Sequence, residues 1–283
     1  MTNTSVNTSP TVKDFRHRSE IPVLVTGFIL TFAAVLTAVL APLTGSEVPS
    51  WSAAAAVAFI SPVIAFAVLI RFRFWSALAN GVEINKSQFS DIYELYVELA
   101  REMGFDGSSK RKAIPRLILL NGNGLINAYA SKCQLNQSYI VLYSDLMAVA
   151  YEKRDLKTIR FVLAHELAHI KCGHVALWRL IVAPVTSLLQ FHKTIIRAQE
   201  YTADRVASYY APEGTPGLVV LYAGSRIYDE VDTEAYFDNL ASQRFGIWLR
   251  IVNVLSDHAV GIRRMQTLKR VEKEGWNVHG SML

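Results

Sequence analysis

The most informative stretch of this sequence is His165-Glu166-Leu167-Ala168-His169, inside a segment of strong helical character over residues 161–170. Two histidines four positions apart lie on one face of a helix, one turn above the other, so both imidazoles can reach a single metal ion. Glu166 can then point at a water molecule on that ion. The alternative interpretation is a pair of packed histidines on an amphipathic helix.

A hydrolytic zinc site needs a third protein ligand and an open position for water, and two downstream residues are candidates. His174 follows His165 by nine residues, which is about half a turn out of phase on a continuous helix. It would face away from the ion unless the helix ended first. Glu200 is the stronger candidate, and it lies in a second expected helix over residues 197–205.

Asp204 follows Glu200 by four residues and therefore shares its helical face. An aspartate at that position can accept the N–H of a ligand histidine and hold its ring. A solvated helix face is the alternative for this acidic pair, but the upstream histidines favour a metal site. The sequence thus predicts one Zn²⁺ per chain, held by His165, His169 and Glu200, with Asp204 behind a histidine.

Two apolar runs lie near the start of the chain. Residues 21–46 contain no charged residue, and neither do residues 48–70. Each run exceeds the roughly 20 residues that a helix needs to cross a hydrocarbon core. With the turn-rich residues 44–50 between them, they predict a transmembrane helical hairpin over residues 21–75. A buried helical pair in a soluble domain is the alternative, and a cleaved signal peptide is a poor fit.

Cations flank the predicted hairpin but are missing from its turn, and they are Lys13, Arg16, Arg18, Arg71 and Arg73. By the positive-inside tendency, both ends of the hairpin face the cytoplasm. We therefore expect a multi-pass protein of the cell membrane (plasma or inner membrane) with both termini cytoplasmic. Its parts would be an N-terminal arm (1–20), the hairpin (21–75) and a cytoplasmic catalytic domain (76–283).

The part after the hairpin is expected to be α+β, with a small sheet followed by helices. Strands are predicted over residues 116–120, 127–132 and 139–143, and helices over residues 90–101, 145–152 and 156–172. Asn121-Gly122-Asn123-Gly124 suits a tight turn between the first two strands. The strand that contains Asn127, Ala128, Tyr129 and Ala130 either presents a free edge to a substrate backbone or is an internal strand without a ligand.

The combination of His165–His169 with Glu200 and Asp204 resembles the M48 family of zinc metallopeptidases. The strand at residues 127–130, the helix start at residues 144–146 and the N-terminal hairpin are similar to the HtpX-like membrane branch of that family. The similarity covers roughly residues 20–270, most of the chain.

This resemblance implies a gluzincin-type fold, zinc ligation by His165, His169 and Glu200, and a catalytic Glu166. It also implies endopeptidase activity on membrane or misfolded proteins. In that chemistry the zinc lowers the pKa of a bound water toward 7, and Glu166 takes a proton from the water and returns it to the leaving amine. A membrane-anchored zinc-binding scaffold with little or no proteolytic activity, which serves a protein partner, is the alternative.

The first departure from the family pattern lies between the two metal motifs. HtpX-like proteins usually carry a second pair of membrane segments there, whereas this chain has only the 30 residues 170–199. Two crossings would need about 40 residues, and a single crossing would separate Glu200 from the histidines. The apolar residues 175–191, which include Arg179 and Pro184, should therefore not span. They are expected at the membrane interface, in a substrate groove or in a plain core helix.

The second departure lies near the C-terminus, where the family often has a His-Pro pair followed by an arginine. Residues 257–264 of this chain read Asp-His-Ala-Val-Gly-Ile-Arg-Arg, without the proline. The roles of His258 and Arg263 therefore stay open. His258 is retained as a candidate donor to the tetrahedral intermediate, the alternative being a helix cap or a surface residue.

Composition excludes several other classes of protein. The chain of 283 residues is 51% hydrophobic, which is too apolar for a disordered protein, and two cysteines cannot form a disulfide framework. A net charge of +5 is modest, and we expect polypeptides and the lipid bilayer, not nucleic acid, as partners. An oligomer or a regulatory partner stays open. The cations of the basic clusters are interpreted as solvated faces or as headgroup contacts: Lys110, Arg111, Lys112, Arg263, Arg264, Lys269 and Arg270.

Overall fold

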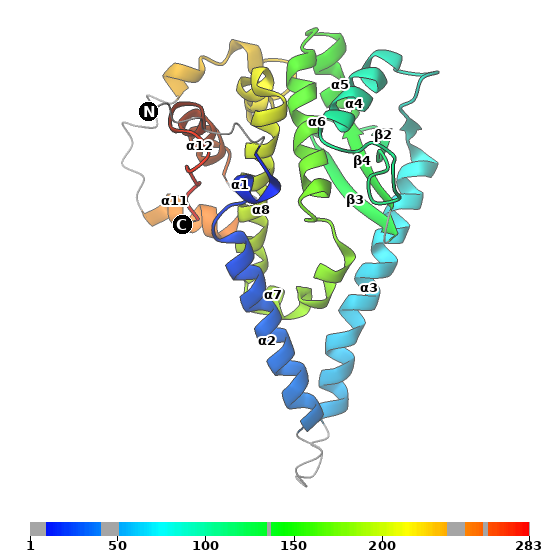
Figure 1. Cartoon of the computed structure of the whole chain (residues 1–283), viewed down its shortest axis with the longest axis vertical. Helices are drawn as coiled ribbons and strands as arrows, with labels where there is room; N and C mark the ends of the chain where they lie inside the picture. The colour runs from blue at the N-terminus through cyan, green and yellow to red at the C-terminus, as the bar shows by residue number, and fades with distance from the viewer. Residues whose placement is uncertain (1–9, 41–50, 135–136, 237–246, 257–259, 283) are drawn as a thin grey trace, which may run out of the picture.

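The computed structural model describes residues 10–40, 51–134, 137–236, 247–256 and 260–282. Two long helices, α2 (Glu20–Leu40) and α3 (Trp51–Asn80), form a V below a mixed body (Figure 1). That body is dominated by helices and contains one small sheet. The mixture agrees with the predicted α+β pattern of a few strands followed by helices.

The sheet has four strands in the order β1-β2-β4-β3. Their bounds are β1 (Val82–Glu83), β2 (Arg116–Leu120), β3 (Ala128–Gln134) and β4 (Gln137–Tyr143). β2 and β4 are parallel, whereas the other two pairs are antiparallel. The two central strands are the most apolar, as expected for strands buried on both faces.

The expected turn after β2 is present, because Asn123 and Gly124 both have positive φ. It does not join a hairpin, however, because β3 pairs with β4 and not with β2. The apolar strand β4 occupies the centre beside β2, and the more polar β3 takes an edge of the sheet. A free edge is the position that a short, partly polar strand tolerates best.

Helices cover both faces of the sheet, following the alternation of side chains along a strand. Leu117, Ile140 and Leu142 face the main core, which they share with α4 (Ser90–Glu102), α5 (Ser144–Tyr151) and α6 (Leu156–Lys171). Ile118 and Val141 face the other way, where the end of α3 packs on them through Ala77. The second long helix is therefore anchored directly to the sheet.

α6 is the central helix of the body. It packs against α8 (Phe191–Tyr210) and against η3 (Pro212–Val219), a 3-10 helix. The approach of η3 requires glycine, because a Cβ atom on Gly217 would lie 1.7 Å from Thr158 Oγ1. The chain then continues through α9 (Val220–Ala223), η4 (Tyr228–Glu230), α11 (Ile247–Leu255) and α12 (Gly261–Glu274).

Two helical windows, Glu20–Thr37 and Ile60–Asn80, are long and apolar enough to cross a membrane by length and composition. They carry exposed apolar side chains such as Phe32 (68% exposed) and Phe72 (67% exposed). Soluble monomeric proteins rarely expose large contiguous apolar surfaces of this kind. These two windows overlap the transmembrane hairpin that the sequence predicts over residues 21–75.

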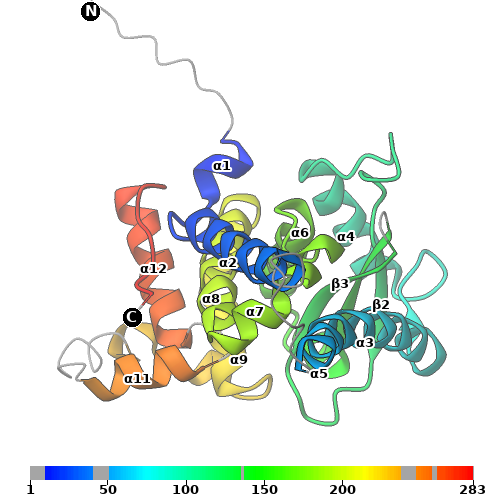
Figure 2. The ribbon, with the colours of Figure 1, turned by 90° about the horizontal axis from the view of Figure 1, so that it is seen from below.

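The apolar residues 175–191 form two short helices, η2 (Leu177–Ile181) and α7 (Ala183–Leu188). Pro184 stands at the start of α7, and Gln190 adopts a left-handed conformation that separates α7 from α8. Neither helix has the length of a membrane span. Both contact α3, and α7 also contacts α2, so this segment lies within the V (Figures 1 and 2).

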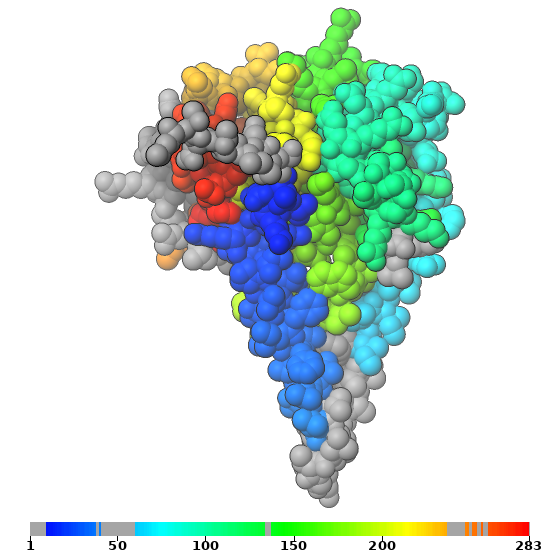
Figure 3. All heavy atoms as spheres, viewed as in Figure 1, coloured from blue at the N-terminus to red at the C-terminus, as the bar shows by residue number. Residues whose placement is uncertain are grey.

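Residues 10–19, which precede α2, pack on the body of the molecule (Figure 3). Phe15, the last residue of the single-turn helix α1 (Val12–Phe15), is fully buried, and its ring centroid lies 5.0 Å from that of Trp276. His17 is also buried, and its Nε2 lies 2.8 Å from the carbonyl oxygen of Gly280. The described part of the N-terminal arm therefore packs against the C-terminal residues, and it fixes where α2 begins.

Candidate metal centre

The helix α6 carries His165, Glu166 and His169 on a buried stretch. Its start is fixed by Asp155, whose Oδ1 accepts the backbone N–H of Thr158 at 3.0 Å, an N-cap that satisfies a free amide of the first turn. The apolar faces of the helix pack into the core, so its backbone is held firmly. Side chains that leave this helix near its C-terminal end therefore have well-defined positions.

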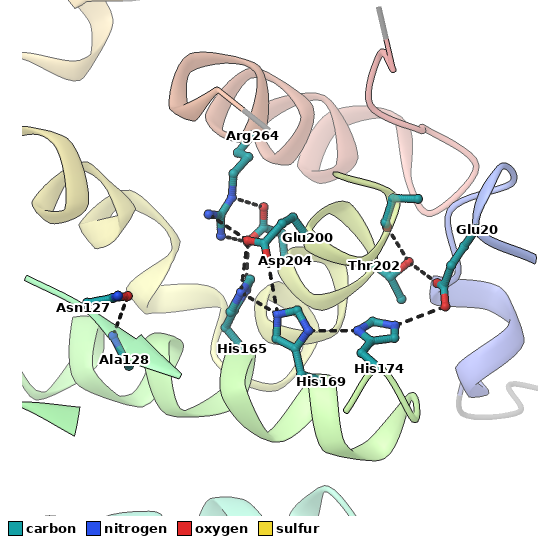
Figure 4. Close-up of polar contacts among 11 residues, drawn as sticks. Glu20, Asn127, Ala128, His165, His169, His174, Glu200, Thr202, Asp204 and Arg264 are labelled. Carbon is teal, nitrogen blue, oxygen red and sulfur yellow. Dashed lines mark hydrogen bonds and ion pairs between the residues drawn. The ribbon is translucent and has the colours of Figure 1, made fainter. Parts of the chain in front are cut away.

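Three side chains converge between α6 and α8 (Figure 4). The Nε2 atoms of His165 and His169 are 3.1 Å apart. Glu200 of α8 places Oε2 at 3.6 Å from His165 Nε2 and Oε1 at 3.5 Å from His169 Nε2. One atom from each residue fits within a group whose members lie within 4.8 Å of one another.

This donor set suits zinc. Atoms bound at about 2.0–2.2 Å to a tetrahedral zinc are separated from one another by about 3.3–3.6 Å. The two Nε2 atoms are 3.1 Å apart, and each lies 3.5 or 3.6 Å from one of the two carboxylate oxygens of Glu200. Two imidazoles and one carboxylate are also a ligand set of catalytic zinc sites, in which the fourth position is open to water. The three sequence-predicted ligands are thus brought together in a geometry that fits the metal.

Asp204, one turn after Glu200, lies behind His165, as the spacing predicts. His165 Nδ1 lies 2.9 Å from Asp204 Oδ1, within ion-pair distance. Burial would lower the pKa of His165, but hydrogen bonds and charges from Asp204 and Glu200 raise it to about 10. A metal ion that binds Nε2 therefore competes with a proton, while the contact at Nδ1 holds the ring in place.

Arg264 of α12 completes this side of the site. Its guanidinium Nη1 is 3.0 Å from Glu200 Oε2, and its Nε and Nη2 donate to Asp204. Burial alone would raise the pKa of Asp204, and Arg264 lowers it, so both acidic residues have a cationic partner. The sequence interpretation of Arg264 as part of a solvated basic face was therefore wrong. The buried acidic pair on α8 was the signal that called for a cation.

His174, which the sequence offered as the weaker candidate for the third ligand, contacts the ligand His169 instead. Its Nδ1 lies 2.9 Å from His169 Nδ1, and its Nε2 lies 3.2 Å from Glu20 Oε1 (Figure 4). Burial lowers the pKa of His174 to about 4. The half-turn phase argument applies to a continuous helix, whereas α6 ends at Lys171 and Gly173 follows with a φ of +74°.

The helix end explains how His174 returns to His169. The N–H of His174 donates to the carbonyl oxygen of His169, and that of Gly173 donates to Ile170. These two bonds form a Schellman motif, which folds the chain back over the last helical turn. His174 consequently contacts the Nδ1 side of His169, whereas the Nε2 side faces Glu200. The glycine after the apolar helix was the available signal.

A cavity of about 370 Å³ opens onto the three ligand residues. Glu166 lines it, together with Tyr222 and the strand segment formed by Asn127, Ala128, Tyr129 and Ala130. Asn127 stands just before β3, and its side chain accepts the N–H of Ala128 at 2.9 Å. The predicted catalytic glutamate and the predicted substrate strand therefore border the same space as the metal ligands. His258 lies outside the described residues.

Comparisons with known proteins agree on one family. The model of peptidase family M48 matches residues 86–194. A plastoglobule-localized metallopeptidase 48 of Arabidopsis thaliana chloroplasts is 23% identical over 198 residues, which are 61% of this chain and 54% of that protein. A protease HtpX homolog of Helicobacter pylori is 25% identical over 233 residues, which are 68% of this chain and 70% of that protein.

The chain thus spans about half the length of the plant relative. No solved structure matches it. The family match covers β2, β3, β4, α6 and the histidine pair, and the similarity to each relative extends over more residues than that region. Over residues 86–194, this chain is similar to peptidase family M48.

Proposed function

We propose that this protein is a membrane-anchored, zinc-dependent endopeptidase of gluzincin type, similar to the HtpX-like branch of family M48. One Zn²⁺ per chain would be held by His165, His169 and Glu200. The observation that carries the proposal is the convergence of these three ligand atoms within 4.8 Å beside a cavity that Glu166 also lines. A metal site without catalytic purpose would not need an acidic side chain on an open cavity.

The residues of the site divide the work of peptide hydrolysis. Zinc at this position would activate a water molecule and polarise the scissile carbonyl. Glu166 accepts a proton from the attacking water and delivers it to the leaving amine. Asp204 holds the ring of His165, and Arg264 balances the charge of the two carboxylates of α8. We propose His258 as a hydrogen-bond donor to the developing oxyanion. Tyr222 lines the cavity, and we propose its hydroxyl group as a second donor.

The edge strand β3 would bind the substrate backbone. Asn127 accepts the N–H of Tyr143 of β4, and residues in an antiparallel pair alternate in direction. The backbone groups of Ala128 and Ala130 therefore point away from β4, along the side that borders the cavity. An extended polypeptide added at this edge would be held mainly by main-chain hydrogen bonds. Broad tolerance of substrate sequence, as for unfolded or membrane proteins, follows from that mode of binding.

The V of α2 and α3 would be the membrane anchor. Its support is the length and apolar composition of both helices and the cations at the two ends that join the body. The positive-inside tendency then favours a cell-membrane protein with both termini and the catalytic domain in the cytoplasm. Cell fractionation with alkaline extraction tests the anchor: the chain is expected to stay with the membrane pellet, and release into the supernatant would overturn this part of the proposal.

Cleavage of unfolded casein tests the enzymatic proposal. The full chain, purified in detergent and supplied with zinc, is compared with Glu166→Gln, which keeps the size of the side chain but removes its basicity. Glu213→Gln, a substitution at an exposed residue that does not line the cavity, is the matched control. We expect cleavage by the wild type and the control, and none by Glu166→Gln at equal zinc content.

Two results would contradict the proposal. If Glu166→Gln cleaves as fast as the wild type, the activity belongs to another site or a contaminant. If the wild type holds one zinc per chain but cleaves no unfolded polypeptide, the metal site serves a different purpose, as in the scaffold alternative.

A further inference from the structure

We propose that Glu20, the first residue of α2, is a positioning residue of the metal centre that acts through His174 on the ligand His169. The proposal rests on the proposed function, because it takes zinc as the ion that His169 binds. Its consequence is that the membrane anchor and the metal site form one unit. An anchor that only tethers the enzyme would have no contact with the ligands.

The three residues form a continuous line of polar contacts (Figure 4). His169 Nδ1 is 2.9 Å from His174 Nδ1, and His174 Nε2 is 3.2 Å from Glu20 Oε1. The side chains of His174 and Glu20 are 1% and 0% exposed. These contacts join residues that are far apart in the sequence, and they are shielded from the solvent that would otherwise compete for them.

Valence fixes the direction of the hydrogen bonds in this line. When Nε2 of His169 binds a metal, its only proton is on Nδ1, which donates to Nδ1 of His174. The proton of neutral His174 is then on Nε2, which lies 3.2 Å from the carboxylate oxygen Oε1 of Glu20. A ligand histidine whose second nitrogen donates to a fixed acceptor is held in one tautomer and one ring orientation. Asp204 performs this task directly for His165, whereas Glu20 performs it for His169 through a second imidazole.

The surroundings of Glu20 keep it charged and in place. Arg16 forms an ion pair with Oε1, and Arg179 Nη2 lies 3.5 Å from the same oxygen. The Thr202 hydroxyl of α8 donates to Oε2 at 2.8 Å. A buried carboxylate needs such partners, and these come from the arm, from η2 and from α8. Arg179 thereby also ties η2, which lies within the V, to the same point.

Zinc affinity is the property that separates this role from a purely structural one. We expect Glu20→Ala and His174→Ala each to weaken zinc binding about ten- to hundredfold, the range for residues that orient metal ligands. The loss in the double variant should be smaller than the product of the two single losses, because the residues act in series. Glu20→Gln keeps an acceptor for His174 and should retain more affinity than Glu20→Ala.

The measurement is zinc titration of the full chain in detergent against a chelator of known affinity, with a thermal melt of each zinc-free variant beside it. His17→Ala is the matched control, because the His17 side chain is buried on the same arm and contacts Gly280, and alanine keeps the main-chain carbonyl that accepts the N–H of Glu20. It should lower the melting temperature and leave zinc affinity at the wild-type value.

The outcomes distinguish this proposal from the proposed function. If the wild type binds no zinc, the proposed function fails. If the wild type binds one zinc and both alanine variants bind it equally well, the positioning role is wrong and the proposed function stands. If Glu20→Ala does not fold, His174→Ala and His174→Leu carry the test, and wild-type zinc affinity in both would overturn the positioning role.

Discussion

Arg264 donates two hydrogen bonds to Asp204, from Nε to Oδ2 at 2.8 Å and from Nη2 to Oδ1 at 2.6 Å. This two-pronged contact joins α12 to α8 in the interior, directly behind a proposed zinc ligand. The remaining guanidinium nitrogen, Nη1, lies 3.0 Å from Glu200. One arginine thus balances two buried carboxylates, and the metal site depends on the helix that carries it.

Replacing Arg264 should therefore destabilise the protein strongly. Arg264→Leu leaves two buried carboxylates without their cation, and removal of one partner of a buried ion pair typically costs about 3–5 kcal/mol. Zinc should restore part of this loss, since it neutralises Glu200. Thermal melts with and without a chelator measure both effects.

Arg270→Leu is the control on the same helix. Arg270 pairs with Glu274 at the surface, where more than half of each side chain is exposed, so its loss should change stability by less than about 0.5 kcal/mol. Equal melting temperatures for the two variants would mean that Arg264 does not support the site.

The edge strand makes a prediction about substrate binding. In Ala130→Pro the outward N–H of β3 is missing, while the bonds to β4 are kept, and an edge strand tolerates proline on its free side. We expect casein cleavage to fall by about tenfold, the worth of one main-chain hydrogen bond of about 1 kcal/mol or slightly more, with unchanged zinc content.

Tyr129→Pro is the matched comparison, since the N–H of Tyr129 points toward β4. This variant should lose stability, because proline removes a hydrogen bond of the ladder. If Ala130→Pro cleaves casein at the wild-type rate, the substrate does not pair with this edge.

The environment of His279 should make the free energy of unfolding depend on pH. Burial, together with the charges of Arg205, His17 and Arg18, lowers the pKa of His279 to about 4. The unfolded chain takes up this proton near pH 6.5, before the folded protein does, so stability should fall as the pH decreases from about 6.5 to 4. His279→Gln keeps an acceptor for Arg205 and should flatten this part of the curve of melting temperature against pH. Parallel curves for variant and wild type would refute the assignment.

Much of the architecture was predictable because it rests on local patterns. The strand β2 and the helix α6 occur within a residue of their predicted bounds, since apolar periodicity, the Asp155 cap and Gly173 all act locally. The grouping of His165, His169, Glu200 and Asp204 followed from the spacing of residues on helices. In each case the necessary information lies within a few turns of one element.

What the sequence did not predict depends on contacts between distant segments. β4 lies beside β2 in the sheet, and β3, which follows β2 in the sequence, lies at the edge beyond β4. No local pattern indicates this order. The buried partner of Asp204 is Arg264 and not Arg263, which depends on the rotation of α12 against α8. Glu20 was only a single charge before an apolar run, and nothing in its neighbourhood indicated a contact with His174 more than 150 residues later.

X-ray absorption at the zinc edge of the full chain in detergent tests most directly whether His165, His169 and Glu200 form a zinc site. We expect one zinc per chain with four nitrogen or oxygen ligands, two of them imidazoles, and loss of the metal in Glu200→Ala. Absence of zinc from the wild type, or a sulfur ligand from Cys133 or Cys172, would contradict this expectation.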